Sequence, residues 1–70
     1  MSTFIVAFDI EKKDYVIGVI RQMKGVTLAS KPAADGTVRV RTKLPTLDAE
    51  ADTVHAIEDI DGVLDLRLIQ

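Results

Sequence analysis

Apolar residues occur along this chain with two different spacings. A continuous apolar run over Thr3–Ile10, rich in β-branched and aromatic residues, predicts a strand. Over residues 11–24 the apolar positions recur every three or four residues, which is typical of an amphipathic helix. Strict alternation over residues 37–43 predicts a further strand, with valines on one side and cations on the other. A second helical spacing follows Pro45 and ends at Ile60.

Glycines separate the two predicted helices from the strands that follow them. Gly25 comes directly before an apolar segment at 26–31, and Gly62 comes directly before another at 63–69. A glycine in the left-handed conformation commonly ends a helix, so both junctions predict a helix that stops where a strand begins. The segment Ala34–Thr37 predicts the turn of a hairpin. The predicted order of elements is therefore β-α-β-β-α-β.

This order predicts a single α+β domain over residues 1–70 with the ferredoxin-like arrangement. Right-handed crossovers place both helices on one face of a four-stranded antiparallel sheet with strand order 4-1-3-2. A chain this short buries only about 60% of the surface that it exposes when unfolded. We therefore expect a second copy or another partner to cover part of the surface of the folded domain. The expected core consists of Phe4, Val6, Phe8, Val19, Ile20, Met23, Val38, Val40, Val54, Ile57, Leu64 and Leu66.

Composition and charge exclude several classes of protein. The net charge of −2 provides no general attraction to nucleic acid or to an anionic membrane. The chain has no cysteine, which excludes a disulfide framework and a thiolate metal site. Residues 1–3 lack the cationic region of a secretory signal, and the chain has no apolar run of about 18 residues. We therefore expect a cytoplasmic protein without a membrane span.

Residues suited to catalysis are few. The single histidine, His55, lies in the second predicted helix with Glu58 three positions later, and two such groups are too few for a metal site. The sequence contains neither a recognisable acid–base set nor a phosphate-binding glycine loop. We therefore expect a protein that binds rather than catalyses, with no metal and no cofactor. A small enzyme whose active site forms between two copies is the weaker alternative.

The face of the sheet away from the helices is expected to be basic. Alternation directs five of the nine cations toward it: Lys31, Arg39, Arg41, Lys43 and Arg67. Apolar side chains of the first and last strands are expected there too: Ile5, Ala7, Val63 and Ile69. An apolar strip beside a basic strip suits an amphipathic peptide, a nucleotide-like anion or a second copy of the sheet. The simplest alternative is that the cations only keep an uncovered sheet soluble.

These positions define a candidate binding site. Its residues are Ile5, Ala7, Arg39, Arg41, Val63, Asp65 and Arg67. Binding of single-stranded RNA needs aromatic residues on the central strands, and residues 37–43 offer arginines instead, so nucleic acid is not an expected partner. The strand expected at 26–31 lies at an edge of the predicted sheet and is a further place where a partner strand could be added.

Four stretches of the sequence carry a family resemblance. They are Thr3–Ala7, Lys24–Val26, Asp35–Val40 and, above all, Ala56–Ile69. Together they resemble the NapD family, the assembly chaperones of periplasmic nitrate reductase. The resemblance implies a cytoplasmic protein that binds the twin-arginine signal peptide of a molybdenum reductase and delays export until the cofactor is loaded. Because such a peptide favours acidic or apolar ground, the resemblance implies that it uses the apolar strip or the acids Asp9 and Asp65.

Other families share the same order of elements. Regulatory domains of the ACT and leucine-responsive-regulator type often carry Gly-Val at the last junction between helix and strand, as Gly62-Val63 does here. Resemblance to them implies a dimerising regulatory domain that binds a small molecule, so a homodimer is one of the expected partners. The heavy-metal-associated domains also share the order, but their paired cysteines have no counterpart in residues 8–12.

Overall fold

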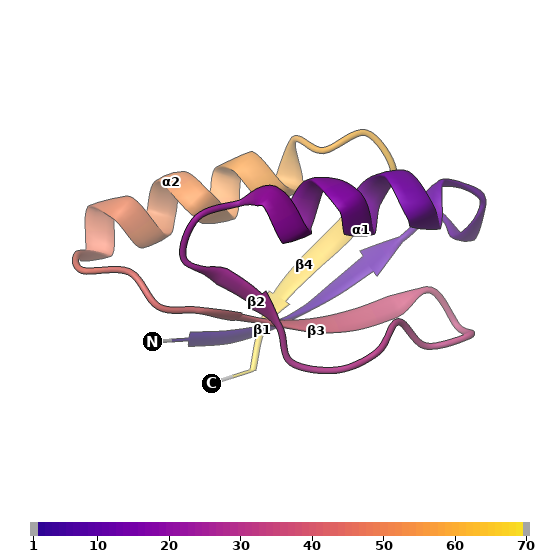
Figure 1. The fold of residues 1–70 in the computed structure, drawn as a ribbon, viewed down its shortest axis with the longest axis horizontal. Helices are drawn as coiled ribbons and strands as arrows, with labels where there is room; N and C mark the ends of the chain where they lie inside the picture. Colours follow the sequence, from indigo (N-terminus) through magenta and orange to yellow (C-terminus); the bar gives the residue numbers. More distant parts are fainter. Residues whose placement is uncertain (1, 70) are drawn as a thin grey trace.

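The computed structural model describes residues 2–69 of the chain. Its elements are β1 (Ser2–Phe8), η1 (a 3₁₀ helix, Ile10–Lys12), α1 (Lys13–Gln22), β2 (Val26–Leu28), β3 (Thr37–Thr42), α2 (Leu47–Glu58) and β4 (Val63–Leu68). The strands form one antiparallel sheet in the order β2-β3-β1-β4, which confirms the predicted order, here counted from the other edge. Both α-helices cover the same face of this sheet and leave the other face uncovered (Figure 1).

The ends of the elements follow local signals in the sequence. The Thr46 hydroxyl oxygen accepts a hydrogen bond from the backbone N–H of Ala49 at 3.0 Å, so Thr46 caps α2. Gly25 and Gly62 have φ angles of 78° and 102°, the left-handed conformation expected at these junctions. At Gly62 a side chain is also excluded by space, because a Cβ atom would lie 2.9 Å from Cγ2 of Val16. The loop after α2 therefore lies directly against α1.

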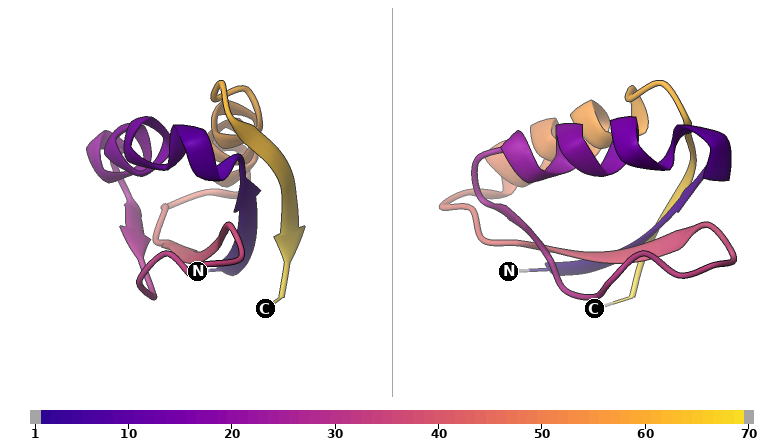
Figure 2. Two further views of the ribbon diagram at one scale, coloured as in Figure 1. Left: turned by 90° about the vertical axis from the view of Figure 1, so that its right-hand side faces the viewer. Right: turned by 45° about the vertical axis from the view of Figure 1, so that its right-hand side comes forward.

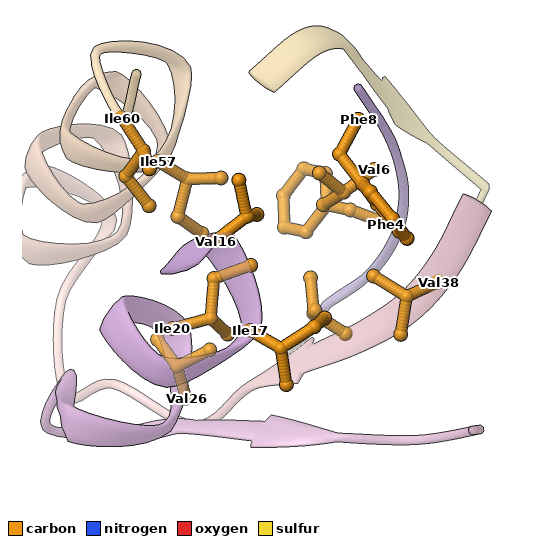
Figure 3. Packing of buried hydrophobic residues seen from close by; sticks show 11 residues of the cluster. Phe4, Val6, Phe8, Val16, Ile17, Ile20, Val26, Val38, Ile57 and Ile60 are labelled. Carbon is orange, nitrogen blue, oxygen red and sulfur yellow. The ribbon is translucent and has the colours of Figure 1, made fainter. Parts of the chain in front are cut away.

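The hydrophobic core fills the space between the helices and the covered face of the sheet (Figure 3). The predicted core is confirmed at the buried residues Phe4, Val6, Phe8, Ile20, Val38, Val40 and Ile57. Other predicted residues are partly buried against this cluster: Val19, Met23, Val54 and Leu66. The structure adds buried apolar residues that the prediction omits: Val16, Ile17, Val26 and Ile60.

Leu64 is the predicted core residue that the structure places outside the core, since it is 71% exposed. The pairing of β1 with β4 is regular up to Ala7 and Asp65, but Phe8 then pairs with Val63. This β-bulge adds one residue to β4 and brings Val63 into contact with the core. The prediction that Leu64 is buried and the prediction that Val63 lies on the uncovered face are both wrong, because strict alternation does not cross the bulge.

Two further boundaries differ from the prediction. The strand expected over 26–31 is paired only at Val26–Leu28, so this edge of the sheet offers little backbone to an added strand. The helix predicted over residues 11–24 is divided in the structure. Its start is the 3₁₀ helix η1, and α1 follows from Lys13 to Gln22. Asp9 caps η1, because its Oδ1 accepts a hydrogen bond from the N–H of Glu11 at 3.0 Å.

Candidate binding face of the sheet

The uncovered side of the sheet, called here the open face, is formed by every second residue of the strands. Its residues are Thr3, Ile5, Ala7, Thr27, Thr37, Arg39, Arg41, Asp65 and Arg67. The residues of β1 and β3 that lie between those of the open face are buried beneath the helices. This burial confirms the predicted outward direction of Arg39 and Arg41. The open face thus contains every candidate binding residue except Val63, which packs against the core.

Ile5 lies at the centre of the open face, between two arginines. Its Cα pairs with Arg39 of β3 on one side and with Arg67 of β4 on the other. Neighbouring strands are about 4.8 Å apart, so the two arginine backbones are separated by about 10 Å. Arg41 follows two residues after Arg39 on the same side of β3. Ile5 therefore lies between basic side chains on both sides, and not beside a single basic strip, whereas Ala7 lies between Thr37 and Asp65.

The arginines of the open face differ in their acidic neighbours. Arg67 Nη2 lies 3.8 Å from Asp65 Oδ2, and both side chains are exposed, so this ion pair is weak. The other ion pairs within residues 2–69 involve neither Arg39 nor Arg41. The positive charges of Arg39 and Arg41 are therefore directed into solvent, where they attract anions and repel cations.

A hollow opens on the open face beside Ile5. The segment after β2 folds back against β3, and Ser30 Oγ accepts a hydrogen bond from the N–H of Arg39 at 3.1 Å. The hollow has a volume of about 350 Å³ and is lined by Ile5, Ser30, Lys31, Ala33, Thr37, Val38 and Arg39. It combines an apolar side chain with hydroxyl groups and with the cations Lys31 and Arg39. Such a lining suits a small ligand with an apolar body and an anionic group.

This hollow is not predicted from the sequence. Lys31 is expected on the basic face, but the predicted binding site contains neither Ser30, Lys31 nor Thr37. A signal was present, because residues 29–36 are too many for a tight two-residue hairpin connection once β2 ends at Leu28. A connection of that length has to fold over one side of the sheet or extend past it.

The acidic residues expected at the rim differ in their availability. Asp9 Oδ1 accepts a hydrogen bond from Glu11, and the N–H of Asp9 donates to the carbonyl oxygen of Gly62 at 2.8 Å. Asp9 therefore holds the end of β1 against the loop before β4. Asp65 lies on the open face opposite Ala7, and its side chain is 61% exposed. Asp65 is thus an acid that a ligand on the open face would meet.

Two other residues expected on this face lie just past the ends of their strands. The N–H of Lys43 donates to the carbonyl oxygen of Gly25 at 2.8 Å, and Lys43 is exposed. The N–H of Ile69 donates to the carbonyl oxygen of Thr3 at 2.9 Å. The pairing of β4 with β1 is therefore extended by one residue.

Groups suited to catalysis or metal binding are dispersed. His55 has an exposed side chain on α2, with Nδ1 3.4 Å from Glu58 Oε1. Within residues 2–69, no group of three or more His, Cys, Asp or Glu side chains is placed to hold a metal ion. What the open face itself offers a partner is charge, apolar contact and hydroxyl groups.

Comparison with known proteins gave no match to a family model, to a curated protein or to a solved structure. No helix described within residues 2–69 is long and apolar enough to cross a membrane. The geometry of the open face is therefore the structural ground on which a function can be proposed.

Proposed function

We propose that this protein is a cytoplasmic assembly chaperone that holds a twin-arginine signal peptide on its open face. The supporting observation is that Ile5 and Ala7 of the central strand β1 alternate with the buried residues Phe4, Val6 and Phe8, so they face away from both helices. Figure 2 shows that both helices lie on one side of the sheet. An apolar peptide segment is stabilised by covering these side chains and the aliphatic stems of the flanking arginines. The resemblance of Ala56–Ile69 to the NapD family favours a signal peptide as that segment.

Charge determines how such a peptide lies on the open face. The paired arginines of the peptide are repelled by Arg39 and Arg41 and attracted by Asp65. Asp65 pairs with Ala7, near the carboxyl end of β1. We therefore place the arginines of the peptide at the Ala7 end of the open face, with its apolar segment over Ile5.

Calorimetric titration with the signal peptide of a molybdenum reductase tests this proposal. Asp65→Asn should weaken binding by about tenfold, because it removes the acid nearest to the arginines of the peptide. The double variant in which both Arg39 and Arg41 are replaced by Glu should bind the peptide more strongly, because the new carboxylates attract the arginines of the peptide that the original arginines repel. Arg21→Glu is the matched control, since Arg21 is an exposed cation of α1 away from the open face.

Three results would contradict the chaperone proposal. The first is an absence of binding to the wild-type protein. The second is equal binding of a peptide in which both arginines are replaced by alanine. The third is an affinity that changes no more in the open-face variants than in Arg21→Glu.

The hollow beside Ile5 favours a second candidate function, a dimerising regulatory domain that binds a small anion. Lys31 and Arg39 supply positive charge in its lining, and Ile5 supplies an apolar contact. Thermal-shift and titration experiments with small carboxylates of varied apolar chain length test this function. Here the double replacement of Arg39 and Arg41 with Glu should abolish binding. The same variant should strengthen binding of a signal peptide, so the two candidates predict opposite signs.

A further inference from the structure

The outer edge of β4 is an exposed and largely apolar strand edge. β4 is the last strand of the sheet, so no strand of the described chain lies on its outer side (Figure 2). Leu64 and Leu68 are 71% and 62% exposed, and Leu66 is partly buried. β4 contains no proline or lysine, two residues that commonly keep natural edge strands from pairing with other chains. Its bulge lies at its beginning and leaves residues 65–68 regularly paired with β1.

The sequence of this edge is self-complementary. The segment is Leu64-Asp65-Leu66-Arg67-Leu68. When it is aligned antiparallel with a second copy of itself, each leucine lies opposite a leucine and each aspartate lies opposite an arginine. Two copies running antiparallel about a two-fold axis at Leu66 therefore set Asp65 of each copy opposite Arg67 of the other. Leu64 of each copy lies opposite Leu68 of the other.

We propose that the protein forms a symmetric dimer through β4, with Leu66 on the two-fold axis and the two sheets joined into one. Residues directly opposite each other in an antiparallel pair share a face of the sheet. Leu66 and Leu68 pair with the buried residues Val6 and Phe4 of β1, so the leucines of the two copies meet on the helix side. The two ion pairs form on the open face.

Other symmetric registers of β4 are disfavoured. A two-fold axis at Asp65 would place two aspartates directly opposite each other, and an axis at Arg67 would do the same with two arginines. Like charges in such positions are destabilising. A slip of one residue would place leucines opposite charged residues and put the helices of the two copies on opposite faces. The axis at Leu66 is the one among these that pairs opposite charges and keeps the leucines together.

The backbone of β4 presents the groups that this pairing uses. The N–H of Ile69 donates to the carbonyl oxygen of Thr3, so the peptide groups of Ile69 point toward β1. Because this direction alternates along a strand, Leu66 and Leu68 point their N–H and C=O groups outward. Leu66 on the axis can therefore exchange both hydrogen bonds with Leu66 of the second copy.

A hollow at the same edge has room for a side chain of the second copy. Its volume is about 180 Å³, and its lining residues are Glu58, Val63, Leu64, Asp65 and Leu66. In the proposed register Leu68 of the second copy lies directly opposite Leu64, next to this hollow. Burial of these leucines would stabilise the dimer by removing apolar surface from water.

Sedimentation of the full chain from low micromolar to about millimolar concentration tests the proposal. The wild-type protein should form dimers. Asp65→Arg and Arg67→Asp should each raise the dissociation constant at least about tenfold, because each creates two like-charge pairs. The double variant Asp65→Arg with Arg67→Asp should restore dimerisation, since the ion pairs re-form with their signs exchanged. Arg41→Asp, on β3, is the matched control and should leave dimerisation unchanged.

Circular dichroism of each variant checks that it is folded, which is expected because Asp65 and Arg67 have exposed side chains. A wild-type protein that stays monomeric over the whole range overturns the proposal. So does a dimer that survives both single charge reversals, or a double variant as weak as the single ones. The dimer and the proposed peptide complex both use Asp65. The peptide titrations are therefore made at concentrations where the chain is monomeric, so that the two proposals are tested separately.

Discussion

At the scale of single residues, Thr42 and Glu50 link the sheet to the second helix. Thr42 of β3 is fully buried, and its hydroxyl donates a hydrogen bond to Glu50 Oε1 of α2 at 3.0 Å. Hydrogen bonds from Ser2 and from Thr42 lower the pKa of the Glu50 carboxyl, while desolvation opposes this shift. A hydrogen bond to an ionised carboxylate is stronger than one to a neutral group, so the link is strongest when Glu50 is charged.

The shifted pKa of Glu50 predicts a pH-dependent contribution to stability. The pKa in the folded protein lies below the ordinary value of 4.5, so ionised Glu50 stabilises the fold above that pH. This contribution is lost as the pH falls through the folded-state pKa. Glu50→Gln should therefore be less stable than the wild type at about pH 7, and the difference should shrink at about pH 3. Urea unfolding at both pH values measures it, and a difference independent of pH would contradict the assignment.

At the scale of elements, two glycines have opposite structural roles. Gly18 lies inside α1, and a Cβ atom there would meet nothing within 4 Å. Gly62 precedes β4 with a φ of 102°, and a Cβ atom there would lie 2.9 Å from both Cβ of Lys12 and Cγ2 of Val16. The first glycine therefore only weakens its helix, whereas the second allows a loop to lie against α1.

Alanine substitutions at these glycines should change stability in opposite directions. Gly18→Ala should raise the free energy of unfolding by about 0.5–1 kcal/mol, because it restricts the unfolded chain and favours the helix. Gly62→Ala should lower it by more than about 1 kcal/mol, because the backbone is strained and the space is filled. Chemical denaturation of both variants measures this contrast, and changes of the same sign would show that the local geometry is misassigned.

At the scale of the whole molecule, the net charge of −2 conceals a two-sided distribution. The open face carries Arg39, Arg41 and Arg67, whereas the helical elements carry the acids Glu11, Asp14, Asp48, Asp52 and Glu58. Two open faces would repel each other if stacked, so the charge distribution opposes a face-to-face dimer. The side-by-side pairing through β4 proposed above avoids this repulsion and sets Asp65 of each copy opposite Arg67 of the other.

The two-sided charge predicts that the arginines of β3 serve binding rather than folding. Arg39 and Arg41 are exposed and form no ion pair within residues 2–69. Replacing both with Glu should therefore change the free energy of unfolding by no more than about 0.5 kcal/mol. Thermal and urea denaturation measure this change. A loss well above that value would mean that the arginines support the sheet, and the binding experiments would then need other variants.

Much of the fold could be predicted because its signals are local. The left-handed glycines at 25 and 62, the cap at Thr46 and the alternation of valine with arginine in β3 each depend on a few neighbouring residues. These signals determine where the chain turns and which side of a strand faces the core. The direction of Arg39 and Arg41 was predictable for this reason.

The sequence by itself determined the order of elements, the sheet order and the basic character of the open face. Only the tertiary structure decided that Ile5 lies between two arginines, that a hollow forms beside it and that Leu64 is exposed. Each of these features depends on which residue of one strand meets which residue of another, and on a bulge opposite Phe8. Such pairings join positions far apart in the sequence, where packing over the whole molecule selects among registers that local patterns leave equivalent.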